Sequence, residues 1–446
     1  MSENCNLIYE LGTRRELFID DFLTADRKNL EFVVHRPEHR FDTVGRIQGY
    51  YQTILDDGIK LRAYARTYIN GQHTPEDIYS GEAWIYAESH DGLHWVKPPC
   101  KIFSGTDEVD YELNHAVVYG PEFQGFTHNF SPLFDPRPEC PSDERYKALA
   151  GVLESGGLST FASSDGIHWR RWSDKPVIVY EERFGDYAFD SQNYAFWSAA
   201  ENCFVMYFRV KTTADGRGPL KTFARSTSVD FRHWSTPELL NVNRNGEHLY
   251  VSQFTPYARA PHYYLGTPTR WFEDHHSATD IGLIFSRAGM PPVRPDIGAW
   301  IRPGLNPVRW ENRMNYLALG IFTLSPEELT LYPAVDEGRY VLRTDGFVSL
   351  SAGLNGGEWL SRPLRYEGGM PEFNVSTSAG GFLQIELRRE DNTPLPGFCF
   401  GDLPDYYGDE IAYRPAWKAP LCLAKGEGFH LALRMKECDL YSFKFE

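Results

Sequence analysis

Acidic residues stand directly before apolar, strand-like segments at several places in the chain. Asp190 precedes the apolar run 191–197. Glu247 opens a later segment, and Glu328 begins another. Two carboxyl groups that converge can divide acid–base work, one giving a proton to a leaving oxygen and the other acting as nucleophile or base, which is the chemistry of glycosidic bond cleavage. Two alternatives stay open: Asp190 caps a turn or pairs with an arginine, and Glu328 pairs with Arg313.

A repeated phrase indicates the elements that must position these residues. Residues 89–95 read Ser-His-Asp-Gly-Leu-His-Trp, and the phrase recurs at 163–169 and more loosely at 226–234. Asp-Gly favours a tight hairpin turn, because glycine accepts a positive φ without strain. Recurrence at intervals of roughly 60–75 residues is typical of propeller blades. The tryptophans that end the phrases, Trp95, Trp169 and Trp234, are expected to be buried between blades.

The repeat and the pattern that follows it predict an all-β protein with two domains. Residues 1–351 are expected to form a five-bladed β-propeller, and residues 352–446 a C-terminal β-sandwich. The segment 16–23 alternates like a strand and is predicted to close the propeller ring. In the third blade, strands are expected at 191–197, 203–209 and 221–226, and residues 230–234 are expected to close the hairpin. The sandwich is predicted either to bind carbohydrate or to act only as a packing partner for the propeller.

Composition narrows the classes of partner. The chain has 446 residues, a net charge of −16 and 15% aromatic residues. This acidity argues against nucleic acid and is compatible with a neutral or cationic substrate or a neutral polysaccharide. The seven cysteines are odd in number and lack a C-x-x-C spacing, so neither a metal site nor a cofactor is expected. The sequence shows neither a leader peptide nor a long apolar run, so a cytoplasmic protein that does not bind a membrane is predicted. The formation of a homo-oligomer is compatible with the sequence.

Seven stretches of the chain carry a resemblance to a known group of enzymes. They are 17–21, 128–132, 145–148, 189–193, 257–262, 310–316 and 328–332. With the propeller-plus-sandwich plan, they resemble the five-bladed glycoside hydrolase superfamily, which includes families 32, 43, 68 and 130, and most closely bacterial proteins described as family 32- or 43-like. The W-M-N-D-P-N, R-D-P and E-C motifs of family 32 are absent.

The resemblance implies an active-site funnel lined by residues at the start of each blade's innermost strand. The candidate catalytic residues are Asp190, Glu247, Glu328 and Asp21. The candidate substrate-binding residues are Gln48, Tyr50, His128, Asn129, Gln192, Asn193, Gln253, Arg270, Arg313 and Asn315. By this resemblance Asp190 is expected to be the proton donor, with a pKa raised by its surroundings.

Several alternatives remain at this stage. Asp21 is adjacent to Asp20, so the two point to opposite faces of a strand and either could be anchored structurally by arginines. His128 is either a sugar ligand or a buried structural histidine, and Arg270 either binds an anionic group or stacks between blades.

The expected function is glycoside hydrolysis of an oligo- or polysaccharide. A phosphorylase, lyase or transglycosylase on the same scaffold is the alternative, and so is a glycan-binding propeller without catalysis, which would lack two carboxyl groups within roughly 5–10 Å.

Overall fold

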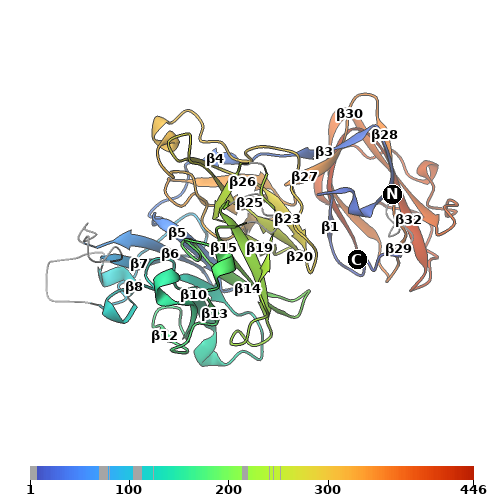
Figure 1. Cartoon of the computed structure of the whole chain (residues 1–446). Coiled ribbons are helices and arrows are strands. Elements are labelled where there is room, and N and C mark those ends of the chain that lie inside the picture. Colours follow the sequence, from blue (N-terminus) through green and yellow to red (C-terminus); the bar gives the residue numbers. More distant parts are fainter. Residues whose placement is uncertain are drawn as a thin grey trace. The chain divides into compact units, whose positions relative to one another are not determined.

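The computed structural model describes residues 8–69, 79, 81–103, 113–123, 125–212, 219–240, 242–244, 246–251 and 253–446. Within them the chain is all-β: the elements are β-strands and short 3-10 helices (Figure 1). The chain divides into two compact units. Unit 1 comprises residues 1–36, 325–329 and 342–446, and unit 2 comprises residues 37–324 and 330–341.

Unit 2 begins with three antiparallel sheets, each built from strands that are consecutive along the chain. The first contains β5 (Tyr50–Asp56), β6 (Leu61–Tyr68), β7 (Glu82–Ser89) and β8 (Ala116–Val118). The second contains β9 (Ser131–Phe134), β10 (Tyr146–Ala150), β11 (Gly157–Ser163), β12 (Arg170–Arg171) and β13 (Ile178–Val179). The third contains β14 (Tyr194–Ser198), β15 (Cys203–Val210), β16 (Thr222–Ser228) and β17 (Glu238–Leu239).

Three further sheets follow. Two of them have three strands: β18 (His248–Val251), β21 (Thr269–Phe272) and β22 (Ala278–Ile281), and then β19 (Phe254–Tyr257), β20 (Ala260–Gly266) and β23 (Ile284–Arg287). The last contains β24 (Phe322–Ser325), β25 (Glu328–Leu331), β26 (Arg339–Arg343) and β4 (Glu38–Arg40). Strand β4 therefore joins the beginning of unit 2 to its final sheet.

The first strands of successive sheets lie side by side. Strand β5 contacts β9, β9 contacts β14, and β14 contacts β19. The segment before β24 returns to β5, because the Leu319 N–H donates to the Gln52 carbonyl at 2.8 Å and the Ile54 N–H donates to the Leu319 carbonyl at 2.9 Å. The inner strands from β5 to β19 thus follow one another side by side, and residues near their beginnings line one cavity.

The repeated phrase forms the same turn in each of its first three copies. The Asp91 carboxylate accepts hydrogen bonds from the N–H groups of Leu93 and His94 at 2.8 and 2.7 Å, and Asp165 and Asp230 do the same in their copies. Gly92 and Gly166 have φ of +74° and +76°, as the Asp-Gly pattern predicts. The third copy has Phe231 at this position, and it adopts a φ of 66° despite its side chain.

The burial of the three tryptophans differs. Trp95 is buried, and its indole N–H donates to the Gly92 carbonyl at 3.1 Å. Trp169 and Trp234 are only half-buried, so the expectation of deep burial holds for Trp95 alone. In the third sheet, residues 230–234 close the hairpin, as the sequence predicts. These residues form the turn, and the outer strand follows at β17.

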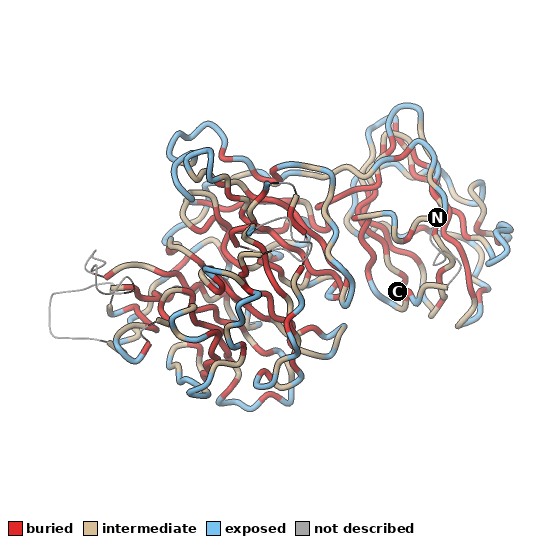
Figure 2. Tube along the Cα trace, viewed as in Figure 1, coloured by how far each residue is buried: buried red, intermediate tan, exposed pale blue. Residues whose placement is uncertain are grey.

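Unit 1 is a curled nine-stranded sheet in which the two ends of the chain pair with each other. Its strands are β1 (Glu16–Leu17), β2 (Thr24–Lys28), β3 (Leu30–Val34), β27 (Val348–Ala352), β28 (Gly357–Ser361), β29 (Leu364–Arg365), β30 (Pro371–Arg389), β31 (Asp409–Tyr413) and β32 (Gly428–Phe445). Buried residues follow the strands and exposed residues gather at the turns, as Figure 2 shows for both units.

The position of the N-terminal segment corrects the expected domain boundary. Strand β1 pairs with β32, not with the last sheet of unit 2, and residues 21–23 form a 3-10 helix. The cause is the apolar side chain of Phe18, which packs edge-on against Trp359 at 5.2 Å and near Phe443 at 5.7 Å in the core of unit 1. Residues 1–36 therefore belong with the C-terminal part of the chain.

Two features are absent from the described residues. No helix among them has the length and apolar character needed to cross a membrane. No group of three or more histidine, cysteine, aspartate or glutamate side chains among them is arranged to hold a metal ion.

Candidate active site

Unit 2 contains a cavity of about 470 Å³ at the beginnings of its inner strands. Six of the residues that line it are tyrosines, and the rest are charged or polar. The lining residues are Tyr50, Tyr51, Arg66, Tyr68, Tyr79, Glu82, His128, Asp190, Tyr250, Asn312, Arg313 and Tyr316. A concave site with aromatic walls and a few convergent polar groups suits a sugar, whose ring faces are apolar and whose hydroxyls need hydrogen-bond partners.

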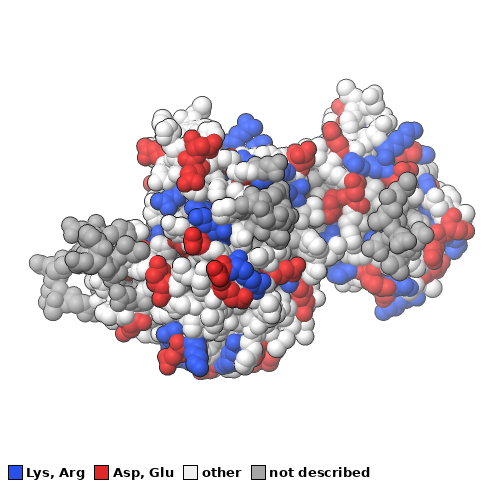
Figure 3. Space-filling view, in the orientation of Figure 1, with Lys and Arg blue, Asp and Glu red and all other residues white. Residues whose placement is uncertain are grey.

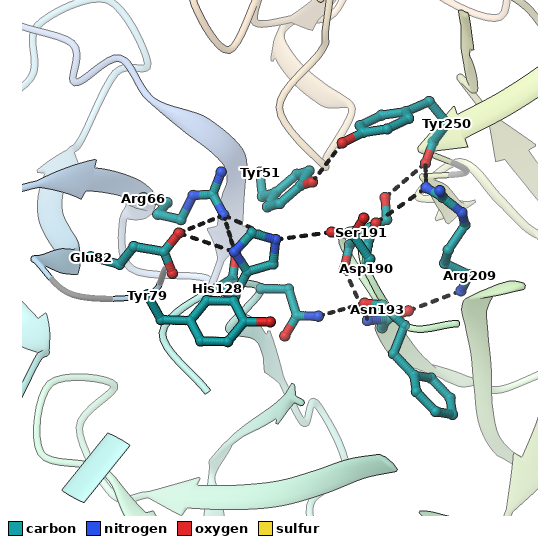
Figure 4. A network of polar contacts seen from close by, with 12 residues as sticks. Tyr51, Arg66, Tyr79, Glu82, His128, Asp190, Ser191, Asn193, Arg209 and Tyr250 are labelled. Atoms are coloured by element: carbon teal, nitrogen blue, oxygen red, sulfur yellow. Dashed lines mark hydrogen bonds and ion pairs between the residues drawn. The ribbon is translucent and has the colours of Figure 1, made fainter. Parts of the chain in front are cut away.

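Three side chains form a hydrogen-bonded chain at this cavity (Figure 4). The Nδ1 atom of His128 lies 3.0 Å from a carboxylate oxygen of Glu82, and its Nε2 atom lies 3.0 Å from Oδ1 of Asp190. The Glu82 side chain is fully buried, whereas that of Asp190 is 36% exposed. Glu82 therefore lies behind the imidazole, and Asp190 is the carboxylate that a substrate can reach.

Arg66 fixes the buried end of this chain. Its Nη1 atom lies 3.2 Å from the Glu82 carboxylate and donates to the His128 carbonyl at 2.7 Å. The guanidinium also lies over the ring of Tyr51, 4.6 Å from the centroid. Arg66 comes from β6, Glu82 from β7 and His128 from the loop before β9, so neighbouring sheets together hold the imidazole in place.

Burial, hydrogen bonds and neighbouring charges decide which of these three side chains carry a proton. Burial alone would lower the pKa of His128, and the Arg66 charge also opposes protonation, but the hydrogen bonds to Asp190 and Glu82 outweigh both and raise that pKa. Burial would raise the pKa of Asp190, but the hydrogen bond from His128 and the Arg209 charge lower it. Asp190 is thus an ionised carboxylate. This direction is opposite to the raised pKa that the sequence predicts for Asp190, because a histidine rather than another acid lies beside it.

The backbone around the cavity is strained at four positions. Tyr51, Phe189, Gln253 and Arg313 have φ of 52°, 66°, 50° and 55°, in the left-handed region that side chains normally avoid. Phe189 directly precedes Asp190, while Tyr51 and Arg313 line the cavity themselves. Such conformations cost on the order of 1–3 kcal/mol each and cluster at functional sites. The strain supports the assignment of this cavity as the functional site.

Four of the residues predicted for the site line the cavity: Asp190, Tyr50, His128 and Arg313. Tyr250 and Tyr316, which stand near the starts of later inner strands, line it as well. Four of the predicted residues, including Asp190, therefore lie together at one cavity.

The buried amides among the candidates are structural, which corrects their assignment to substrate binding. Asn129 donates to the carbonyls of Gly151 and Phe189, both at 2.6 Å. Gln192 donates to the Thr53 hydroxyl at 2.8 Å and accepts from Gln253 at 3.1 Å. Asn193 donates to the carbonyls of Phe189 and Ser191 at 2.8 and 2.9 Å. These amides tie the inner strands together, and none lines the cavity.

Four other candidates also lie off the cavity wall. Glu247 is buried in ion pairs with Arg294 at 3.0 Å and Arg270 at 3.4 Å. Arg270 also binds both oxygens of Asp280, at 2.6 and 2.7 Å, so neither group is available to a ligand. Asn315 donates to the Thr279 carbonyl at 2.6 Å, and Gln48 is an exposed residue outside the lining.

The remaining two carboxylates, Asp21 and Glu328, are also absent from the cavity lining. Asp21 is exposed and pairs with Arg27 at 3.4 Å, in agreement with the structural alternative for this residue. Glu328 begins β25 and is half-buried. Neither is a partner for Asp190 in the cavity.

Sequence reasoning missed Arg66 and Glu82. Both lie on the second and third strands of their sheet, whereas the search considered the first strands. A signal for Glu82 was present: like Asp190, it directly precedes an apolar strand segment, 83–87. Arg66 lies within its strand and carries no such signal.

Known proteins resemble this chain in structure but not in sequence. No protein-family model and no curated protein matches the sequence. Among solved structures, a family 43 arabinoxylan arabinofuranohydrolase from Bacillus subtilis, in complex with cellotetraose, is 11% identical, with a TM-score of 0.47 over 90% of this chain and 96% of that chain. A thermostable family-43 glycoside hydrolase is 12% identical, with a TM-score of 0.45 over 70% and 95%.

A third similar structure is an N-acetylgalactosamine deacetylase from F. plautii in complex with blood group B trisaccharide. It is 10% identical, with a TM-score of 0.41 over 91% of this chain and 95% of that chain. Solved family 43 glycosidases are thus among the structures similar to this chain, as the sequence resemblance predicted. Likeness at this level assigns no role to any residue, and the function rests on the cavity itself.

Proposed function

We propose that this chain is a glycoside hydrolase whose active site is the cavity of unit 2. In this proposal the sheets of unit 2 are the five blades of a propeller, with the two three-stranded sheets sharing the fourth, and unit 1 is a β-sandwich. The observation that carries the functional proposal is the Glu82–His128–Asp190 chain, which ends in an ionised, accessible carboxylate inside a tyrosine-lined cavity.

Asp190 acts as the base in this mechanism. It takes a proton from a water molecule whose oxygen bonds to the anomeric carbon, while the bond from that carbon to the leaving oxygen breaks and the leaving oxygen takes a proton from the solvent. Burial raises the pKa of Tyr51 and Tyr316 well above the usual value, so both hydroxyls stay protonated and can serve as donors to the sugar. His128, held by Glu82, positions the Asp190 carboxylate and balances its charge.

One observation favours a second candidate, a polysaccharide lyase. Glycosidases usually place two carboxyl groups in reach of the bond, but of the two that line the described cavity only Asp190 has an exposed side chain. Elimination from an acidic sugar needs a base, a hydroxyl that donates a proton and a cation that faces the sugar's carboxylate. In this cavity Asp190 would be the base, Tyr51 the hydroxyl donor and Arg313 the cation. A lyase product would carry a carbon–carbon double bond that absorbs ultraviolet light, and a hydrolase product would not.

A screen of aryl glycosides and natural oligosaccharides, followed by NMR of the products, tests both candidates. With a substrate in hand, Asp190→Asn is expected to lower turnover by about 10²–10⁴-fold, because the amide cannot take up the proton. Asp143→Asn is the matched control, since Asp143 is exposed and pairs with Arg170 at 2.8 Å away from the cavity lining. Wild-type turnover by Asp190→Asn would refute the proposal.

A further inference from the structure

Three cationic side chains gather around the ring of Tyr250 in the cavity wall. Arg313 donates to the Tyr250 hydroxyl at 3.3 Å. The ammonium of Lys221 lies 4.9 Å from the ring centroid, and the guanidinium of Arg209 lies 5.0 Å from it. Arg209 also donates to the backbone carbonyls of Asp190 and Tyr250, both at 3.2 Å, which places it directly behind the catalytic carboxylate (Figure 4).

These three cations differ from other buried or half-buried cations of unit 2. Arg62, Arg270 and Arg339 each bind a carboxylate at 2.5–2.7 Å. Among the residues that the structure describes, no carboxylate lies within ion-pair distance of Arg209, Lys221 or Arg313. Arg209 is 2% exposed, and its Nε and Nη2 atoms are buried without a hydrogen-bond partner in the described part of the chain. Leaving a buried donor unpaired is costly, so such groups call for an explanation.

The charge around Tyr250 is opposite in sign to the net charge of the whole protein. The protein carries a net charge of −16, and on the face drawn in Figure 3 acidic and basic side chains are interspersed. At Tyr250, in contrast, cations repel one another: burial and the charges of Arg209 and Arg313 lower the pKa of Lys221 to about 7, although the charges of Asp190 and Glu273 act in the opposite direction. The nearby Asp190 carboxylate is hydrogen-bonded to His128, at 3.0 Å, and not to any of these three side chains. The three cations therefore lie together without a described carboxylate in ion-pair distance of any of them.

We propose that the cation group of Arg209, Lys221 and Arg313 binds an anionic group of the substrate, which in a glycan is the carboxylate of an acidic sugar. This inference rests on the proposed function and names its substrate class. Arg313 lines the cavity and its planar guanidinium matches a carboxylate, while Lys221 and Arg209 add charge from behind Tyr250. The negative net charge of the protein alone would favour neutral or cationic substrates, but the side chains gathered at this site are cations.

Ligand-observed NMR with matched sugars tests the inference without requiring turnover. Methyl glycosides of glucuronic and galacturonic acid are compared with those of glucose and galactose. The acids are expected to bind at least about 10-fold more tightly, as a charge-assisted hydrogen bond implies, and the difference should shrink with added salt. Arg313→Gln and, independently, Lys221→Met should each reduce the preference several-fold. Arg170→Gln removes an exposed cation that is not part of the cavity lining and should leave it unchanged.

The outcomes separate this inference from the hydrolase proposal. Equal binding of acidic and neutral sugars overturns the anion site, and cleavage of neutral glycans that depends on Asp190 would then leave the hydrolase standing. Preferred binding of the acids, lost in Arg313→Gln, supports the anion site even if no glycan is cleaved. Inorganic phosphate is the third probe: cleavage that requires it and yields a sugar phosphate would overturn the carboxylate as the bound anion.

Discussion

The buried end of the Glu82–His128–Asp190 chain gives the sharpest prediction. Glu82→Gln keeps the shape of the side chain and leaves an oxygen to accept from His128, but it removes the negative charge 3.0 Å from the imidazole. An opposite charge at such a distance shifts a pKa by about 1–3 units. Burial and the Arg66 charge both act to lower the pKa of His128, so without Glu82 we expect it to fall by at least about 1 unit, or about 1.4 kcal/mol.

The pKa of His128 can be read directly from long-range ¹H–¹⁵N correlation spectra of histidine-labelled protein between about pH 5 and 9. Glu88→Gln is the matched control, because Glu88 lies on the same strand, β7, and pairs with Lys60 instead. The wild type and the control are expected to titrate above the ordinary histidine value, and Glu82→Gln below them. Identical titration of His128 in all three proteins would refute the electrostatic reasoning.

The same shift makes a prediction about stability. Because the pKa of His128 is raised in the folded protein, its contribution to stability is fully present below about pH 6.5 and is lost as the pH rises through the folded pKa. The urea concentration that unfolds unit 2 should therefore decline above neutrality in the wild type and decline less in Glu82→Gln. The variant should also be less stable at pH 6, by about 3 kcal/mol, because Arg66 loses its buried partner.

Two further predictions concern the frame around the site. Trp95→Ala should destabilise unit 2 by about 3–5 kcal/mol in urea unfolding, whereas Trp310→Ala, at a site that is 55% exposed, should change stability by less than about 0.5 kcal/mol; equal effects would contradict the burial of Trp95. Gln192→Leu should lower stability by about 1–3 kcal/mol with little change in KM, because its amide binds the Thr53 hydroxyl and Gln253. A large rise in KM at unchanged stability would instead make Gln192 a substrate ligand.

Local patterns in the sequence predict the strands and turns of this fold well. In the third sheet, the expected strands at 203–209 and 221–226 match β15 and β16 within a few residues. The Asp-Gly phrase predicts the turns because its conformation depends on a single φ and a single carboxylate. The part of the chain after residue 352 is likewise built from strands, of which β30 and β32 are the longest among the described residues.

What the sequence does not predict depends on partners far along the chain. The segment 16–23 has the same alternation whether it pairs with β26 or with β32, and its position is decided by Trp359 and Phe443. Polar residues at strand starts look alike whether they face the cavity, as Asp190 does, or hold neighbouring strands, as Asn129 and Gln192 do. Only the paired arginines show that Glu247 is structural.

The role of Asp190 is tested most directly by comparing two leaving groups in Asp190→Asn. If Asp190 is the base, the variant should lose about 10²–10⁴-fold in turnover on both a natural oligosaccharide and an aryl glycoside with an activated phenol, because both need an activated water. If Asp190 were the proton donor, the activated phenol would leave without help and its turnover would be spared. Equal losses are the result expected from an ionised carboxylate beside His128, and a spared aryl glycoside would contradict it.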